Sequence, residues 1–288
     1  MSELLVEAPG TSTIRSHKHR VQFLVVAAVV FIALVVVCSI FGGSIAPYAA
    51  SAQDLGTGLA GPSSAHLLGT DDLGRDVLSR VIVGARTAVV GPIVVAVGAM
   101  AIGTALGLLA GYRGGWLGSL IMRWVDLMYA VPQLLIAIVV VGVLHGSYWV
   151  AVAVLIVLTS PGDTRIMRSG AVEQRGLPYA EAAKVNGLSG SSILFRHIWP
   201  SLMPLTVAQS FLNFATTIVN LAALSFLGLG VGPGAADWGR MLAEARTLIA
   251  GNPWAAIVPG ICIAVTAASM NIIGDWLYES LSLRGRAR

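Results

Sequence analysis

The chain has 288 residues, of which 56% are hydrophobic and only 11% are charged, and its mean hydropathy is +0.81. A soluble domain carries about 25% charged residues, so this chain has too little polar surface to cover itself in water. The composition excludes an ordinary soluble domain and indicates an all-α protein that crosses a membrane several times. The net charge of +4 is spread over connecting segments, which argues against nucleic-acid binding.

The N-terminal region predicts a tail followed by a first transmembrane helix. Residues 1–20 are polar and basic, and residues 21–41 form an unbroken apolar run. Such a run is long enough to cross a hydrocarbon core of about 30 Å as a helix. A signal peptide is the alternative, because the small residues at 49–52 resemble a cleavage site. Its apolar core would be only about 7–15 residues long, so an uncleaved span is favoured.

Residues 42–85 are expected to form an extracytoplasmic loop that ends in an amphipathic helix. The loop is rich in Gly, Pro, Ser and Ala. Between residues 73 and 85, apolar residues recur at helical spacing and charged residues occupy the opposite face. This helix is expected either at the membrane interface or at the edge of the bundle. The two faces are Leu73, Val77, Leu78, Val81, Ile82 and Ala85 against Asp72, Arg75, Asp76, Ser79 and Arg80.

Residues 86–280 predict a core of five further transmembrane helices. The second span, residues 86–111, carries Gly103, Gly107 and Gly111 at four-residue spacing. Small residues on one face let another helix approach closely, so these glycines predict helix packing rather than chemistry.

The third span, residues 120–143, contains an acidic residue that we interpret as structural. Asp126 is expected near the cytoplasmic start of its helix, where the helix dipole favours an anion, and Arg123 lies three residues away. Beyond it, the sequence predicts a fourth span opening at 148–158, a polar cytoplasmic segment at about 159–204, a fifth span at 205–229, a sixth span at 254–277 and a cytoplasmic tail at 281–288.

The distribution of basic residues supports this topology. Cytoplasmic segments of membrane proteins carry an excess of Lys and Arg. On the predicted topology, most of the 18 basic residues lie on the cytoplasmic side, which places both termini there. The exceptions are Arg75, Arg80, Arg86, Arg240 and Arg246.

The sequence offers no catalytic residues and no metal site. All the histidines lie in a terminus or a loop, and Cys38 and Cys262 lie singly in apolar runs. Neither Lys18 nor Lys184 belongs to a phosphate-binding loop. The chain is therefore expected to be no enzyme and to hold no cofactor, and any ATP must be bound by a partner.

An ion-coupled secondary transporter is the main alternative class. Such proteins use ionisable residues or broken helices near the middle of the bilayer. The only acids expected near spans are Asp126 and Asp275, both towards the cytoplasmic side, and the chain shows no internal repeat. These features argue against ion-coupled secondary transport.

A polar stripe on the fifth span is the candidate translocation pathway. Its members recur at steps of four, three and four, which places them on one helix face. The stripe either bonds to neighbouring helices or lines a wet passage, and the sequence leaves both open. It consists of Gln209, Asn213, Thr216 and Asn220, with Thr266, Ser269 and Asn271 of the sixth span as candidates to complete the lining.

One cytoplasmic stretch carries a recognisable motif. It reads Glu181-Ala182-Ala183, three residues, Gly187, nine residues and then His197-Ile198-Trp199-Pro200. This resembles the EAA loop of the inner-membrane permeases of ABC importers, with Trp199 where the family has leucine. The stretches 68–80, 223–231 and 271–275 resemble the dipeptide, oligopeptide and nickel branch, in particular its C-type (DppC/OppC-like) subunit, whereas the C-terminal tail departs from it.

This resemblance implies a type I ABC importer permease with six transmembrane helices in the bacterial inner membrane. Such a subunit forms half of a translocation pathway for di- or oligopeptides and works by alternating access. The implied partners are a B-type permease, two cytoplasmic ATPase subunits that bind ATP and magnesium, an extracytoplasmic substrate-binding protein and membrane lipid. Nickel or a haem-like cargo is the alternative within the same role.

The resemblance also implies that the motif residues form a coupling loop that docks on the ATPase. They are Glu181, Ala182, Ala183, Gly187, His197 and Pro200. Small alanines permit close docking, and a glycine lets the chain reverse direction. Ser189 is expected to cap a second short helix, which Pro200 and Pro204 are expected to end.

Overall fold

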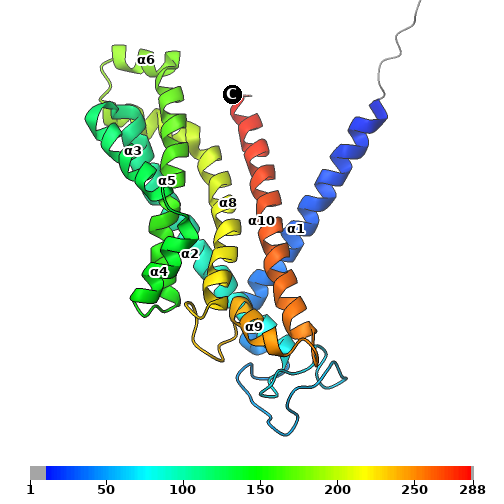
Figure 1. Ribbon diagram of the computed structural model, residues 1–288. Helices are drawn as coiled ribbons and strands as arrows, with labels where there is room; N and C mark the ends of the chain where they lie inside the picture. The colour runs from blue at the N-terminus through cyan, green and yellow to red at the C-terminus, as the bar shows by residue number, and fades with distance from the viewer. Residues whose placement is uncertain (1–10, 287–288) are drawn as a thin grey trace, which may run out of the picture.

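The computed structural model describes residues 11–286, with side chains from 22 to 282. Within this part of the chain the protein is an all-helical bundle, and the one β pairing is an isolated bridge between Thr70 and Asp76. In this described part, five helices are long and apolar enough to cross a membrane, and the number is six if one bent helix pair counts as a single span (Figure 1). The predicted all-α membrane fold is confirmed.

Helix α1 (Thr11–Ile45) begins within the segment that was expected to be a tail, of which residues 1–10 lie outside the described residues. It packs against α2 and α10. Val35 is buried in the cluster that these helices share, and a Cβ at Gly42 would lie 3.1 Å from the carbonyl oxygen of Ile82. Through these contacts the first helix packs on the rest of the bundle.

Helix α2 (Val77–Arg113) is a single element of 37 residues. The separate amphipathic helix expected before residue 86 is instead the first turns of α2. Asp76 caps this helix, because its carboxylate accepts a hydrogen bond of 2.8 Å from the backbone N–H of Ser79. The face expected to be polar is also buried: the side chains of Arg75 and Arg80 are 3% and 2% exposed.

Burial of these arginines is possible because acidic side chains surround them. Arg75 donates to Asp71 at 2.7 Å and to Glu244 at 3.1 Å. Arg80 pairs with Asp71 and donates to Glu244 at 2.8 Å. Glu244 belongs to the short helix α9 (Trp238–Glu244), so this charge network, Asp71, Arg75, Arg80, Arg240 and Glu244, joins the long loop to a distant segment.

The network lowers the pKa of Glu244. Burial raises it, but the charge of Arg80, the backbone N–H of Gly234 and the side chain of Arg240 outweigh this and hold the pKa below its ordinary value. A carboxylate with a lowered folded-state pKa contributes stability at neutral pH that is lost as the pH falls through that pKa. The end of the bundle that carries α9 and the loop 46–76 is therefore expected to loosen in acid.

The third span is broken rather than straight. Helix α3 (Gly115–Tyr129) and helix α4 (Gln133–Val143) meet at an angle of 82°. Pro132 lacks an N–H and disfavours helical geometry at the residue before it, so the helix ends there. Asp126 consequently lies in the last turn of α3, not near its start, and its carboxylate pairs with Arg165 at 2.8 Å instead of Arg123.

Helix α5 (Tyr148–Arg175) extends through residues 159–175, which were expected to lie in the polar loop. Its polar composition hides a buried face made of Pro161, Thr164, Met167 and Ala171, and this face packs on α2. The polar loop after α5 is accordingly shorter than predicted. Arg175, the last residue of α5, donates to the carbonyl oxygen of Tyr112 at 2.9 Å and ties the ends of α5 and α2 together.

The glycines of α2 form the contact with α5. A Cβ at Gly107 would lie 2.7 Å from the Cβ of Met167, and one at Gly111 would lie 2.7 Å from the Cβ of Ala171. At Gly103 it would clash with the Cβ of Asp163 and approach the backbone of Asp163 to 3.0 Å. The regular spacing of the glycines therefore lets two helices lie in close parallel contact.

The segment after α5 contains the short helix α6 (Pro178–Val185), then α7 (Gly190–Ile193), the π-helical turn η1 (Leu194–Ile198) and α8 (Trp199–Phe226). Ser189 caps α7 by accepting from the backbone N–H of Ser192 at 3.3 Å. The prolines do not end this helix, contrary to expectation. Pro200 lies in the first turn of α8, directly after the π-helical turn η1. Proline is tolerated there because it has no backbone N–H that would need a partner in the first turn of a helix.

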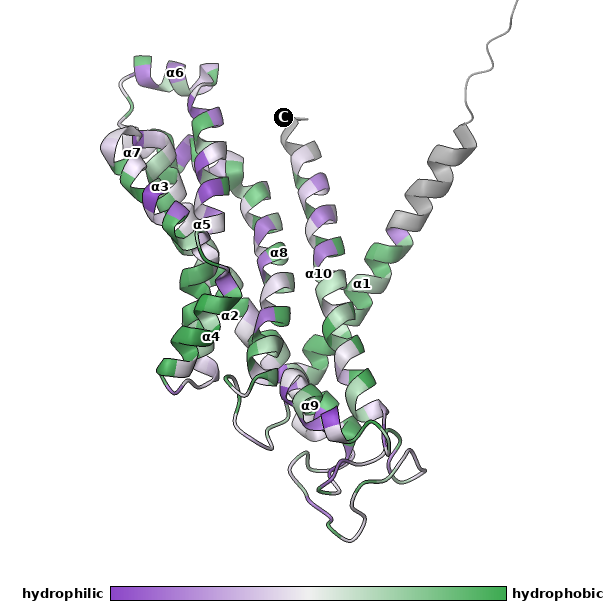
Figure 2. Ribbon diagram, viewed as in Figure 1, coloured by the Kyte–Doolittle hydropathy of each residue, from purple (hydrophilic) through white to green (hydrophobic). Residues whose placement is uncertain are grey.

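The chain continues through α9, the short 3₁₀ turn η2 (Ala245–Thr247) and the last helix, α10 (Trp254–Arg286). Helix α10 runs into the predicted tail at 281–288, of which residues 287–288 lie outside the described part. Figure 1 shows α6 and the end of α10 at one end of the bundle, with α9 and the loop 46–76 at the other. Figure 2 shows hydrophobic residues along α4 and hydrophilic residues at α6.

Candidate functional site

The first part of the candidate coupling motif, Glu181 to Ala183, lies on α6, which has one buried face and one exposed face. Ala180 and Ala183 are 0% and 6% exposed and pack into a cluster with Ile193, whereas Glu181 and Ala182 point to solvent. Of the two motif alanines, only Ala182 is therefore available to another protein. Around it stand apolar side chains that the sequence analysis did not single out, Tyr179, Val185 and Leu188, of which Val185 is 88% exposed.

Gly187 ends α6 in a left-handed turn with φ of 77°. The N–H of Gly187 donates to the carbonyl of Lys184, and the N–H of Leu188 donates to the carbonyl of Ala183, which is the Schellman arrangement. A Cβ at Gly187 would meet no atom within 4 Å. The glycine is therefore required by the backbone conformation and not by lack of space.

The second half of the motif packs against the buried face of α6. Ile198 is fully buried in the same cluster as Ala180 and Ala183. His197 is half-buried and Pro200 is exposed, and both lie where η1 joins α8. The two halves of the motif thus belong to one packed unit, in which α6 rests on the start of the fifth span.

The polar stripe of α8 lines a cavity of about 630 Å³ between α3, α4, α5, α8 and α10. All four stripe residues, Gln209, Asn213, Thr216 and Asn220, belong to the lining, and Asn271 of α10 joins them. Thr266 is fully buried and donates to the carbonyl of Cys262 within its own helix, and neither it nor Ser269 lines the cavity.

The stripe also bonds to a neighbouring helix, so its two interpretations hold together. The amide of Gln209 donates to Asn213 at 3.3 Å, and the amide of Asn213 donates to Asp163 on α5 at 2.8 Å. Asn213 is 4% exposed, whereas Thr216 is exposed. The buried members hold α8 against α5, and the exposed members face the open space.

Asp163 is the main functional candidate that the sequence analysis missed. It is 1% exposed and lines the cavity inside a helix long enough to cross the membrane, so the earlier statement that only Asp126 and Asp275 are acids near spans is wrong. The error follows from assigning residue 163 to a loop. Its spacing from Met167 and Ala171, on the buried face of α5, was the available signal.

The rim of this cavity carries an ion pair. Arg165 lines the cavity, donates to Asp126 at 2.8 Å and lies over the ring of Tyr129 at 4.7 Å from its centre. Both charged side chains are half-exposed or more, at 50% and 65%. Gln133, at the start of α4, reaches Thr159 of α5 at 3.4 Å. The break in the third span therefore places polar groups of α3 and α4 against α5.

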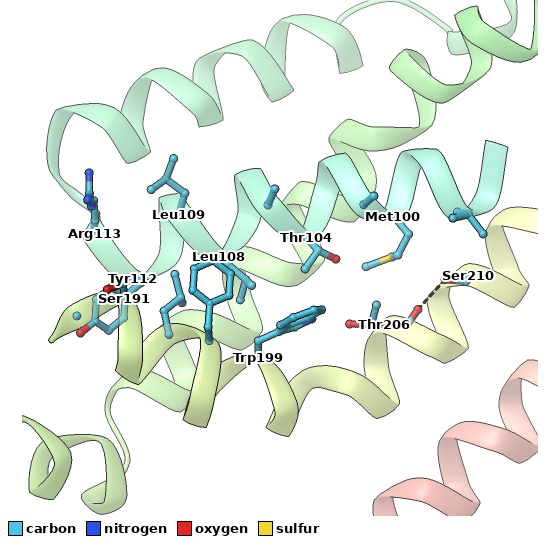
Figure 3. Close-up of a pocket in the computed structure, with 16 residues that line it drawn as sticks. Met100, Thr104, Leu108, Leu109, Tyr112, Arg113, Ser191, Trp199, Thr206 and Ser210 are labelled. Carbon is cyan, nitrogen blue, oxygen red and sulfur yellow. Dashed lines mark hydrogen bonds between the residues drawn. The ribbon is translucent and has the colours of Figure 1, made fainter. Parts of the chain in front are cut away.

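A second and larger cavity of about 970 Å³ lies between α2 and the start of α8, close to the coupling motif (Figure 3). Its lining is mainly apolar, with Met100 and Leu108 from α2 facing Trp199. Tyr112, Arg113 and Ser191 lie at its other end. This groove lies beside the contact of α2 with η1 and α8, and the residues of α8 that line it, Trp199, Thr206 and Ser210, do not line the first cavity.

Comparison with known proteins decides the family. Residues 103–286 match the family described as binding-protein-dependent transport system inner membrane component. The chain belongs to this family. The matched region includes the glycines of α2, the coupling motif and the whole polar cavity, so every site described above lies within or beside it.

Known relatives are similar in sequence over most of the length of this permease. It is 39% identical over 223 residues to the dipeptide transport system permease protein DppC of Alkalihalophilus pseudofirmus, covering 77% of this chain and 73% of the relative. It is 37% identical over 261 residues to the glutathione transport system permease protein GsiD of Pectobacterium atrosepticum, covering 90% and 87%. A di/tripeptide permease of Pseudomonas aeruginosa is 36% identical over 257 residues, covering 87% and 85%. The chain is therefore a permease component of a membrane transport system.

Proposed function

We propose that this permease imports peptides, forming half of a pathway whose other half is a B-type permease. The relatives named above transport dipeptides, tripeptides or glutathione. The cavity supports the same cargo class, because it is lined by amides and hydroxyls that match the hydrogen bonds of a peptide backbone. Its volume of about 630 Å³ is in the usual range for small-ligand sites.

The energy source in this proposal is ATP bound with magnesium by two separate ATPase subunits in the cytoplasm. The observation that carries it is the exposed face of α6, where Glu181 and Ala182 lie among exposed apolar side chains at one end of the bundle. Exposed apolar patches of this kind mark protein contacts. Both termini lie on the same, cytoplasmic side in this arrangement, and a substrate-binding protein delivers cargo at the opposite end.

The first prediction tests the coupling surface in reconstituted complexes with the ATPases and the binding protein. An Ala182→Arg substitution places a bulky cation on the docking face while leaving the buried Ala180 and Ala183 untouched. We expect uptake of a labelled dipeptide to fall at least tenfold, because losing one well-packed interface position costs about 1.4 kcal/mol or more. Unfolding temperature should remain unchanged.

The matched control is Ser119→Arg, which introduces the same guanidinium at an exposed position of α3. It should transport normally. Wild-type uptake should require ATP and persist when the proton gradient is collapsed. Uptake that instead follows the gradient would favour an ion-coupled transporter, and normal uptake by Ala182→Arg would refute the docking assignment.

The second prediction concerns the pathway. Thr216 donates only to carbonyls of its own helix, and Asn220 is not fully buried, so replacing both with leucine leaves no buried partner unpaired. Each lost hydrogen bond to passing cargo or water is worth about 1 kcal/mol, so uptake by Thr216→Leu/Asn220→Leu should fall about thirtyfold without loss of assembly. Ser210→Leu, which faces the other cavity, should be neutral. Equal uptake by the wild type, Thr216→Leu/Asn220→Leu and Ser210→Leu would exclude the cavity lined by the polar stripe as the pathway.

A further inference from the structure

The polar cavity holds a carboxylate without a cation. Among the described residues, no Lys, Arg or His lies within ion-pair distance of Asp163. One carboxylate oxygen accepts from Asn213, and the other is buried without a hydrogen bond of normal length, with the amide of Gln209 as its nearest polar side chain. Buried polar groups in folded proteins are almost always paired, so an orphan oxygen calls for a ligand.

The lack of a cationic partner is costly because Asp163 lies inside the helical bundle. An acidic side chain inside a membrane bundle is destabilising by about 2.5 kcal/mol or more unless it has a partner. An asparagine or serine at this position would also bond to Asn213. Contact with α2 at Gly103 leaves no space on that side for a compensating side chain from α2. The remaining open side is the cavity itself.

The charges of the cavity lining favour a cationic ligand. The only cation in the lining is Arg165, and it is already paired with Asp126 at the rim. Asp163 is thus the uncompensated charge of the lining. The other polar members, Gln133, Thr159, Gln209, Asn213, Thr216, Asn220 and Asn271, are neutral amides and hydroxyls.

We infer that Asp163 binds the terminal ammonium group of the cargo during its passage. This inference rests on the proposed function, since it takes peptides as the cargo. An unmodified peptide carries one ammonium group followed by amide groups, and the cavity offers one carboxylate followed by amide and hydroxyl side chains. Asn213 positions the carboxylate, and its exposed neighbours receive the peptide backbone.

The test compares two probes, dialanine and N-acetyl-dialanine, in ATP-driven uptake by the reconstituted complex. The acetyl group removes the positive charge. The measured quantity is the rate of dialanine uptake divided by the rate of N-acetyl-dialanine uptake. The binding protein is the same in every preparation, so its own preference cancels when this ratio is compared between the wild type and a variant. We expect Asp163→Asn, which keeps the shape and the hydrogen bond to Asn213, to reduce the ratio about tenfold.

A second variant tests the inference even if Asp163→Asn assembles poorly. Asp163→Asn/Asn213→Asp exchanges the two side chains, so it preserves their hydrogen bond and moves the carboxylate to α8. We expect it to restore at least part of the preference for dialanine. An unchanged ratio in both variants, whatever the absolute rates, would show that Asp163 is a structural hydrogen-bond acceptor only. If the wild type takes up neither probe with ATP, peptide import itself fails and the inference with it.

Discussion

A Gly103→Leu substitution should abolish assembly of the permease. Even the first atom of a new side chain would clash with Asp163 and approach the backbone of Thr164 to 3.0 Å. Since the obstacle is partly backbone, it cannot rotate away, and the helices would have to separate. Overpacking typically costs about 1–3 kcal/mol, and separating the two helices would add the loss of the contacts at Gly107 and Gly111.

The amount of complex recovered from membranes and its thermal unfolding measure this effect. Gly103→Ala should show an intermediate loss. Gly43→Ala is the matched control, because Gly43 also lies in a helix and a Cβ there would meet nothing within 4 Å. Normal recovery of Gly103→Leu would mean that α2 and α5 are not held at this distance in the membrane.

The second large effect is expected at Asp71. Its carboxylate accepts from Arg75 and pairs with Arg80, and both arginines are almost fully buried. In Asp71→Ala, Glu244 would be the only carboxylate left beside two buried guanidinium groups. Breaking a buried pair by removing one partner costs about 3–5 kcal/mol, because an uncompensated charge stays behind.

Limited proteolysis of the loop 46–76 and the unfolding temperature would report this loss. Asp72→Ala is the control, since Asp72 is the next residue, has the same chemistry and is exposed. It should behave as wild type. If the two variants were equally stable, the network would be an accessory to the loop rather than the reason that it keeps its position.

Much of this fold was predictable because its signals are local. The glycine row of α2, the capping by Ser189 and the left-handed turn at Gly187 each depend on a few neighbouring residues. Hydropathy indicated where each span lies, although it left residues 159–175 of α5 in a loop, and helical periodicity placed the whole polar stripe on one face. These features need no knowledge of a partner helix.

What sequence reasoning missed depends on contacts between distant residues. Arg80 is separated from Glu244 by 164 positions, so its charge looked solvent-exposed until its partner was known. Asp163 was assigned to a loop because residues 159–175 are polar overall, although their small residues face α2. The break before Pro132 depends on a residue that many transmembrane helices tolerate.

The continuity of α2 has a mechanical consequence. A helix of 37 residues is about 55 Å long, so α2 connects the two ends of the bundle. One end is held through Arg80 by Asp71 and Glu244, and the other end is held through Tyr112 by Arg175, just before α6. We therefore expect a tilt imposed at one end to reach the other. Because such coupling is reciprocal, an event at the end that carries α9 should alter the binding of a partner to α6 as much as that partner alters the α9 end.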